Sequence, residues 1–247
     1  MMTDCEIRNR SGERIDHHFH PGTRADALVI LAHGVTGNMD RPHLIALADG
    51  LAARGWPCLR ISYSGNGGSE GRFEDSCITK EIGDLQAVLD AVPDTAKAAY
   101  VGHSMGGAVG VLTAARDLRI RALISLAGMT HTAAFVQREF GDVTPGQGCM
   151  WDDENCPLSQ IYVDDLNSIN DTLSAAEAVT QPWLLIHGEA DDLVPVQDSR
   201  DALAAAICEK QILEIAGAGH SFDEANYPQL VAAVDGWLTL SFGEVGS

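Results

Sequence analysis

A serine between two glycines ends a short apolar stretch near the middle of the chain. The residues from 98 onward read Ala-Ala-Tyr-Val-Gly-His-Ser-Met-Gly-Gly, and a run of small and apolar residues follows. A Gly-x-Ser-x-Gly sequence between a strand and a helix is typical of a sharp turn that exposes the serine hydroxyl. Gly102 and Gly106 suit this turn because a Cβ at either position would collide with the neighbouring strand and helix. Ser104 is therefore a candidate nucleophile, with a chance serine in an ordinary turn as the alternative.

Two later segments offer the partners that a serine nucleophile needs. An imidazole must accept the hydroxyl proton, and a carboxylate must orient the imidazole and stabilise its positive charge. His220 and Asp191 each follow an apolar run, and the chain order Ser, Asp, His is the one expected with such a turn. We favour Asp191 over Asp192 because it lies midway between Gly188 and Val194. The alternatives are a helix-capping aspartate and an exposed histidine in a turn.

The tetrahedral intermediate of acyl transfer also needs hydrogen-bond donors for its oxyanion. The backbone N–H of Met105, directly after the candidate nucleophile, is one expected donor. The second should come from the turn after the first buried strand, where the sequence reads His-Gly-Val-Thr-Gly-Asn, and we choose the N–H of Val35. His33 is expected to brace this turn, since His220 already fills the role of the base.

Apolar runs and helical patterns alternate along the chain and predict the scaffold for these residues. Continuous apolar runs indicate strands that are buried on both faces of a parallel sheet, and a spacing of three to four residues indicates helices. The alternation predicts an α/β fold with a parallel sheet covered on both faces, whose strand ends gather the candidate residues at one edge. The strands are expected at 27–32, 56–63, 120–128, 182–188 and 211–215 and before Ser104, and the helices at 42–54, 75–91, 197–207 and 228–240.

The segment 129–181 contains no strand pattern and is expected to form a lid over the site. It holds nine acidic residues against Arg138 as its only Lys or Arg, so it does not resemble a binding surface for an anionic substrate. Long insertions of this kind often carry helices and contribute to binding sites. Its large apolar side chains are candidate substrate contacts, with a core of the lid itself as the alternative: Phe135, Phe140, Met150, Trp151 and Tyr162.

Charge and composition exclude several classes of function. The chain has 247 residues and a formal net charge of −19, so its field repels nucleic acids and anionic membrane surfaces. No basic segment precedes an apolar one at the N-terminus, and the scattered cysteines suit reduced thiols, so we expect a cytoplasmic protein. The pair Cys149 and Cys156 has no zinc-site spacing and no histidine nearby, which leaves a local disulfide or free thiols. We expect no metal and no cofactor.

Four motifs together resemble the α/β-hydrolase superfamily, and the resemblance covers nearly the whole chain. They are Gly-His-Ser-Met-Gly, His-Gly-Val-Thr-Gly-Asn, Gly-Glu-Ala-Asp-Asp-Leu-Val-Pro and Gly-Ala-Gly-His. The stretch Ser-Gly-Asn-Gly-Gly-Ser-Glu-Gly-Arg-Phe-Glu-Asp is similar to bacterial esterases of the cinnamoyl/feruloyl esterase and monoacylglycerol-lipase-like groups. The resemblance implies a single domain over 1–247, with a mostly parallel eight-stranded sheet and a lid inserted after strand 6.

The residues and the resemblance lead to one expected activity. We predict a serine hydrolase that cleaves carboxylic esters through an acyl-enzyme, on a small-molecule substrate that is neutral and partly apolar. A thioesterase and a small amide or peptide hydrolase of the aminopeptidase type are alternatives, because the same groups serve these reactions. A receptor that kept the fold without turnover is another alternative, and a homodimer is an alternative to a monomer.

Overall fold

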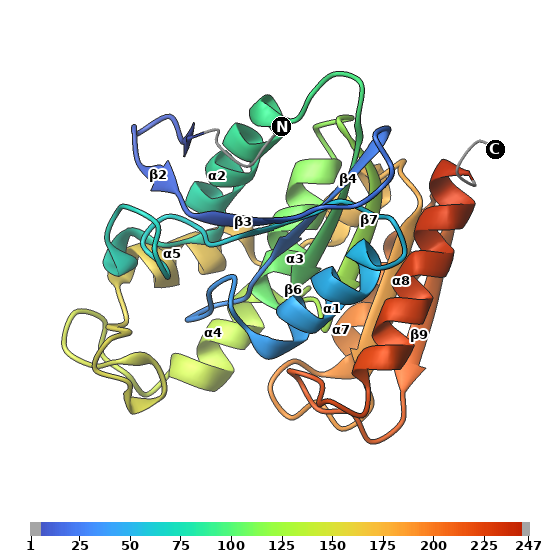
Figure 1. Cartoon of the computed structure of the whole chain (residues 1–247). Helices are drawn as coiled ribbons and strands as arrows, with labels where there is room; N and C mark the ends of the chain where they lie inside the picture. The colour runs from blue at the N-terminus through green and yellow to red at the C-terminus, as the bar shows by residue number, and fades with distance from the viewer. Residues whose placement is uncertain (1–5, 244–247) are drawn as a thin grey trace.

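The computed structural model describes residues 6–243 and arranges them around one seven-stranded sheet (Figure 1). The strand order is β3-β5-β4-β6-β7-β8-β9, and every neighbouring pair is parallel except β3 with β5. The predicted mostly parallel sheet is therefore confirmed. Its strands are β3 (His17–His20), β4 (Ala27–Ala32), β5 (Cys58–Ile61), β6 (Lys97–His103), β7 (Ile120–Leu126), β8 (Trp183–Gly188) and β9 (Lys210–Ile215).

The expected eighth strand is not part of this sheet, so the count of eight is wrong for the described residues. The first two strands, β1 (Ile7–Arg8) and β2 (Arg14–Ile15), pair only with each other as a short antiparallel hairpin. Their side chains Ile7 and Ile15 are buried in the same apolar cluster as the helix that follows β5. The hairpin thus buries its apolar side chains against a helix, without joining the main sheet. One edge strand of that sheet is therefore β3.

Helices cover both faces of the sheet, as the alternation predicted. In β4, Leu28 and Ile30 enter one apolar cluster, while Val29 and Leu31 enter the other. The period of two residues in a strand divides its side chains between the two faces in this way. On one face α1 (Pro42–Ala52) lies beside α8 (Tyr227–Phe242), and the other face is covered by α2 (Ile78–Ala91), α3 (Met105–Ala114) and α7 (Val196–Ala205) (Figure 1).

The segment between β7 and β8 is helical and contains no strand, as expected for residues 129–181. Apart from one isolated bridge between Cys149 and Pro157, it consists of helices and loops. Its helices pack on one another and on α2, α3 and α7 (Figure 1). They are α4 (Thr132–Phe140), the short 3-10 helix η3 (Met150–Asp152), α5 (Gln160–Ile169) and α6 (Leu173–Ala178); a further 3-10 helix, η2 (Phe73–Asp75), precedes α2.

Two further properties of the described residues bear on function. Within residues 6–243, no helix combines the length and the apolar character that a crossing of the lipid bilayer requires. Cys149 and Cys156 are both free thiols, so of the two alternatives for this pair the structure has the reduced one.

Candidate active site

Ser104 occupies a strained turn between β6 and α3. Its backbone has φ 55° and ψ −119°, a conformation that residues with a side chain rarely adopt. A Cβ on Gly102 would lie 2.1 Å from the carbonyl oxygen of Gly106, and a Cβ on Gly106 would lie 2.5 Å from that of His33. These distances are far below van der Waals contact, so both glycines are required by the close approach of β6, α3 and the end of β4.

His220 and Asp191 form a hydrogen-bonded pair at the ends of two other strands. The Nδ1 atom of His220 lies 2.8 Å from Oδ2 of Asp191, and the Asp191 side chain is 1% exposed. Asp191 follows β8, and His220 follows β9. Because the carboxylate is an acceptor, His220 carries a proton on Nδ1, and its Nε2 is left as a proton acceptor.

Three N–H groups donate to the carboxylate of Asp191, and a second imidazole, which is hydrogen-bonded to the carbonyl of Val194 at 2.9 Å, lies beside it. The backbone N–H groups of Leu193 and Val194 both donate to Oδ1 at 2.9 Å. This second imidazole, that of the fully buried His187, contacts Oδ2 at 3.1 Å beside the contact from His220. Burial alone would raise the pKa of Asp191, but the contacts with His187 and His220 hold it well below its usual value. The carboxylate is therefore ionised and fixed in place.

Ser104 and His220 line the same cavity, which has a volume of about 110 Å³. The Ser104 hydroxyl is buried, and Oγ has no hydrogen-bond partner among residues 6–243. In structures without substrate, a bond between nucleophile and base is often long and tightens in the complex. The other lining residues are Gly34, Val35, Thr36, Gly37, Arg41, His43, His103, Trp151, Leu193 and Ser221.

The two expected oxyanion donors belong to the two turns that meet at Ser104. Within the described chain, neither the N–H of Val35 nor that of Met105 donates to a protein acceptor. A Cβ on Gly34 would lie 2.6 Å from Cβ of Ser104, so the turn after β4 approaches the nucleophile directly. The structure thus brings Val35, Met105 and Ser104 to one place, with two backbone donors free.

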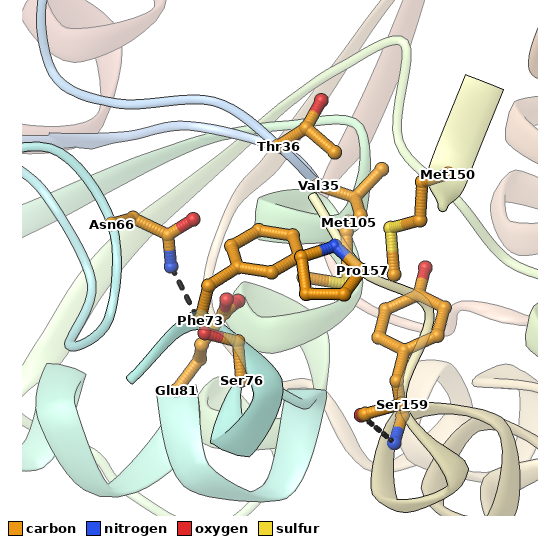
Figure 2. Close-up of a pocket in the computed structure, with 11 residues that line it drawn as sticks. Val35, Thr36, Asn66, Phe73, Ser76, Glu81, Met105, Met150, Pro157 and Ser159 are labelled. Carbon is orange, nitrogen blue, oxygen red and sulfur yellow. Dashed lines mark hydrogen bonds between the residues drawn. The ribbon is translucent and has the colours of Figure 1, made fainter. Parts of the chain in front are cut away.

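Val35 and Met105 also line a second cavity, which shares Val35 and Thr36 with the cavity of Ser104 (Figure 2). Its volume is about 10 Å³, which is room for about one water molecule. Most of its wall is apolar, and Asn66 and Ser76 satisfy each other through a hydrogen bond of 3.1 Å. It is lined by Val35, Thr36, Asn66, Phe73, Ser76, Glu81, Met105, Met150, Pro157, Ser159 and Tyr162.

Glu81 and Tyr162 bring unpartnered polar atoms to this second cavity. Each residue is 1% exposed, and neither Oε2 of Glu81 nor the Tyr162 hydroxyl has a hydrogen-bond partner in the described chain. In Figure 2 the Glu81 carboxyl rises from α2 toward Phe73. Burial raises the pKa of Glu81 well above its usual value, and the negative charges of Asp84 and Asp165 add to this effect. Glu81 is therefore a neutral acid that can donate a hydrogen bond.

The structure divides the five candidate residues of segment 129–181 between the two cavities and the core of that segment. Met150 and Tyr162 line the second cavity, and Trp151, which is 42% exposed, lines the cavity of Ser104. Phe135 and Phe140 line neither of these two cavities. Their rings pack against each other at 6.0 Å between centroids, and Phe140 packs against Trp151 at 4.9 Å. The side chains of Phe135 and Phe140 are both buried in the apolar core of segment 129–181, and a contact of either with substrate stays a prediction.

Three further histidines surround the nucleophile turn. The ring of His33 bridges two strand ends, because Nδ1 contacts the carbonyl of Gly34 at 2.7 Å and Nε2 accepts the N–H of Tyr63 at 3.0 Å. The Nε2 atom of His103 contacts the backbone carbonyl of His220 at 2.9 Å, and its ring lies between those of His43 and His220. Bracing by His33 was expected, and the position of His43 was not.

Sequence reasoning missed Glu81, His187, Arg41 and His43. A signal existed for Glu81, which is spaced three residues after Ile78 and four before Leu85 on the apolar face of α2. A charged residue on such a face is unusual and indicates a special environment. His187, inside the apolar run of β8, carries a similar signal. Arg41 and His43 lie in a polar turn and a helix start, where nothing in the residue pattern distinguishes them.

Comparisons with known proteins agree with the α/β architecture. A family model for the alpha/beta hydrolase fold matches residues 27–148. An uncharacterized protein of Mycobacterium tuberculosis is 28% identical over 228 residues, which cover 90% of this chain and 73% of that protein. The human mitochondrial palmitoyl-protein thioesterase ABHD10 is 30% identical over 105 residues, which cover 42% of this chain and 34% of that protein.

Solved structures match over nearly the full length. Est1E from Butyrivibrio proteoclasticus with bound ferulic acid gives a TM-score of 0.86 at 24% identity and covers 97% of this chain and 100% of that one. Mouse alpha/beta hydrolase domain-containing protein 10 gives a TM-score of 0.79 at 21% identity, with coverage of 95% and 98%. The chain therefore has the α/β-hydrolase fold. The family model and the thioesterase relative support a hydrolase.

Proposed function

We propose that this protein is a serine hydrolase that cleaves carboxylic esters, with Ser104, His220 and Asp191 as its catalytic residues. One observation carries the proposal: a strained, buried serine and an Asp-bonded histidine, far apart in the sequence, line a single cavity. Two free backbone N–H groups beside them would hold an oxyanion. No metal or cofactor is needed for this chemistry.

The reaction follows from the positions of the donors and acceptors. Oγ of Ser104 attacks the carbonyl carbon while its proton passes to Nε2 of His220, and Val35 and Met105 stabilise the negative oxygen. The bond from carbon to the alcohol oxygen then breaks, and that oxygen takes the proton from His220. Water repeats the sequence on the acyl-enzyme and releases the acid. Throughout, Asp191 fixes the ring of His220 and stabilises its positive charge.

The position of His220 assigns one cavity to the alcohol half of the ester and the other to the acyl half. The alcohol oxygen must reach His220, so the alcohol half belongs in the cavity that His220 lines. The acyl half then extends into the second cavity, beyond the donors Val35 and Met105. That cavity is apolar and has room for about one water molecule, so without movement it takes only the methyl-sized end of a short, neutral acyl group. Longer acyl groups would require movement of Met150 and Tyr162, and we propose residues 129–181 as the lid that makes this movement.

The test is hydrolysis of p-nitrophenyl acetate by the wild type and the Ser104→Ala variant. We expect turnover by the wild type, no turnover by the variant, and acetylation of Ser104 in peptides from a rapid acid quench. Turnover that survives Ser104→Ala would contradict the proposal. Binding of the ester without turnover would instead indicate a receptor on the same fold.

A thioesterase is the second candidate, favoured by the name of the human relative, a palmitoyl-protein thioesterase. Phenyl acetate, its thioester S-phenyl thioacetate and its amide acetanilide share one acyl group and separate the three reactions. We expect the ester to have the highest kcat/KM. A thioester preference of more than about tenfold would move the assignment to a thioesterase, and an amide preference would move it to an amide or peptide hydrolase.

The remaining expectations form part of the same proposal. We propose a cytoplasmic protein that acts on small molecules and binds neither nucleic acid nor membranes. Cell fractionation tests the location, and activity after treatment with a chelator tests the independence from metal. Sedimentation equilibrium distinguishes a monomer from a homodimer.

A further inference from the structure

The cavity of Ser104 has an unusual charge for this protein. The whole chain has a formal net charge of −19, yet the lining of this cavity includes no Asp or Glu and one permanently charged group, the guanidinium of Arg41. Salt reduces the influence of distant exposed charges beyond about 10 Å, so nearby groups decide the potential at the cavity. Arg41 is therefore the one permanently charged side chain on the lining, and the Asp191 carboxylate lies behind His220 as the partner of its Nδ1.

Arg41 is free to bind a ligand. It directly precedes α1 and is exposed, and one Nη2 contact to the carbonyl of Thr36 at 2.9 Å holds it beside the cavity. It forms no ion pair with an acidic residue of the described chain. A guanidinium has five N–H donors, so several remain available on the side of the solvent and the cavity.

His43 adds a buried, unpartnered nitrogen to the same wall. The residue is 2% exposed, and its Nε2 atom has no hydrogen-bond partner in the described chain. Burial lowers the pKa of His43 to about 4, and the charges of His220 and Arg41 act in the same direction. The neutral ring can donate one hydrogen bond from Nε2. It stands in the first turn of α1, whose N-terminus has no side-chain cap and carries the positive end of the helix dipole.

The acidic lid does not cancel the charge of Arg41. Glu139 accepts a hydrogen bond of 3.2 Å from Trp151, which lines the cavity, but it is already paired with Arg138 at 2.9 Å. The other cavity contains no Lys or Arg and includes the neutral acid Glu81. An anionic group on the substrate would therefore be stabilised on the side of Arg41 and His43, and not on the side of Glu81.

We propose that Arg41 and His43 form a binding site for a carboxylate carried by the alcohol half of the ester. The inference rests on the proposed function, because that function places the alcohol half in the cavity of His220. A planar guanidinium matches a carboxylate with two parallel hydrogen bonds, and one cation balances one negative charge. The preferred substrate is then an ester of a hydroxy acid, with a neutral acyl half in the second cavity.

Two probes that differ only in charge test the site. 4-Acetoxybenzoate and 4-acetoxybenzamide share the acetyl group and the shape of the alcohol, so the ratio of their kcat/KM values reports recognition of the carboxylate. Each variant is compared through the same ratio, which cancels the intrinsic reactivity of the two esters. We expect Arg41→Gln to lower the ratio of acid to amide about five- to tenfold, as for loss of a charge-assisted hydrogen bond. Arg41→Lys should keep part of the preference.

Controls separate this effect from general damage. Arg116 is also exposed and lacks an ion pair in the described chain, so Arg116→Gln should keep the wild-type ratio. The Arg41 effect should weaken when salt is raised, because the pair is exposed. Hydrolysis of both probes with the same ratio in the wild type and Arg41→Gln would overturn the inference and leave the proposed function intact. If the wild type hydrolyses neither the probes nor p-nitrophenyl acetate, the proposed function itself fails, and the inference fails with it.

Discussion

Replacement of Asp191 by Asn removes one charge and keeps the shape of the side chain, so it tests the proposed role of this residue directly. In the wild type, Oδ1 accepts two backbone N–H groups and Oδ2 faces two imidazoles. An asparagine has one acceptor oxygen and one NH₂ donor group. In the variant, an acceptor oxygen can therefore face either the two backbone N–H groups or the two imidazoles, but not both.

The backbone side decides the orientation of the amide. The N–H groups of Leu193 and Val194 cannot become acceptors, and leaving them unpaired would cost roughly 1–3 kcal/mol each. A neutral imidazole can carry its proton on either nitrogen. We expect the amide oxygen to stay on the backbone and the NH₂ group to face His220. His220 then accepts at Nδ1 and carries its proton on Nε2, where it can no longer take the proton of Ser104.

The expected loss is about 10⁴-fold in kcat, the size seen when this substitution imposes the wrong tautomer in a serine protease triad. That factor corresponds to about 5.5 kcal/mol in the activation free energy. Steady-state hydrolysis of p-nitrophenyl acetate measures it, with Ser104→Ala as the baseline and thermal unfolding as the check that the variant folds.

Asp192→Asn is the matched control. Asp192 is exposed and next in sequence, so its variant should keep kcat within about twofold of the wild type, as expected for a surface change. A kcat within tenfold of the wild type for Asp191→Asn would refute the tautomer argument. An equal loss in both variants would show that the negative charge acts at a distance and not through the His220 contact.

Three further predictions concern the turn, the buried acid and the lid. Gly106→Ala should destabilise the fold by at least about 2 kcal/mol in urea unfolding, because its Cβ would lie 2.5 Å from the His33 carbonyl. Gly236→Ala, in α8 with nothing within 4 Å, should be neutral or stabilising. Burial raises the pKa of Glu81, so the folded state holds its proton more tightly than the unfolded state, and stability falls as pH rises above about 4.3. Glu81→Gln has no carboxyl group to titrate and does not show this loss. The free energy of unfolding of the variant minus that of the wild type should therefore be larger at pH 8 than at pH 5. An equal difference at both pH values would contradict a neutral buried acid. Trp151→Ala should raise KM for p-nitrophenyl acetate, because Trp151 lines the cavity of Ser104. Since its side chain is 42% exposed, kcat and thermal stability should change little. A fall in kcat alone would exclude a binding role.

Local sequence patterns predicted the main elements well. The four predicted helices begin and end within a few residues of α1, α2, α7 and α8, and the six predicted strands correspond to strands of the main sheet. These elements are recognisable because their period and their buried faces are local properties of the chain. The number of strands in the main sheet could not be predicted in this way. The segments of Ile7 and Ile15 form strands whether they join the main sheet or pack against a helix.

The candidate nucleophile, base and acid were also accessible from sequence, because each follows a recognisable strand in a fixed order. Their geometry was not. The His220–Asp191 contact joins residues from two loops, and its strength depends on His187 and on two backbone donors that no motif reports. Within segment 129–181, Phe135 and Met150 look alike as apolar residues, yet of the two only Met150 lines one of the two cavities described above.

The sequence by itself determined which segments become strands and helices, where the tight serine turn lies, and which side chains have the chemistry for acyl transfer. The tertiary structure decided how these groups meet: that Arg41 and His43 line the same cavity as Ser104, and that Oε2 of Glu81 is buried without a partner in the described chain, beside the candidate oxyanion donors. The physical reason is that secondary structure depends on neighbours along the chain. Charge, burial and hydrogen bonding at a site depend on segments that only the folded sheet brings together.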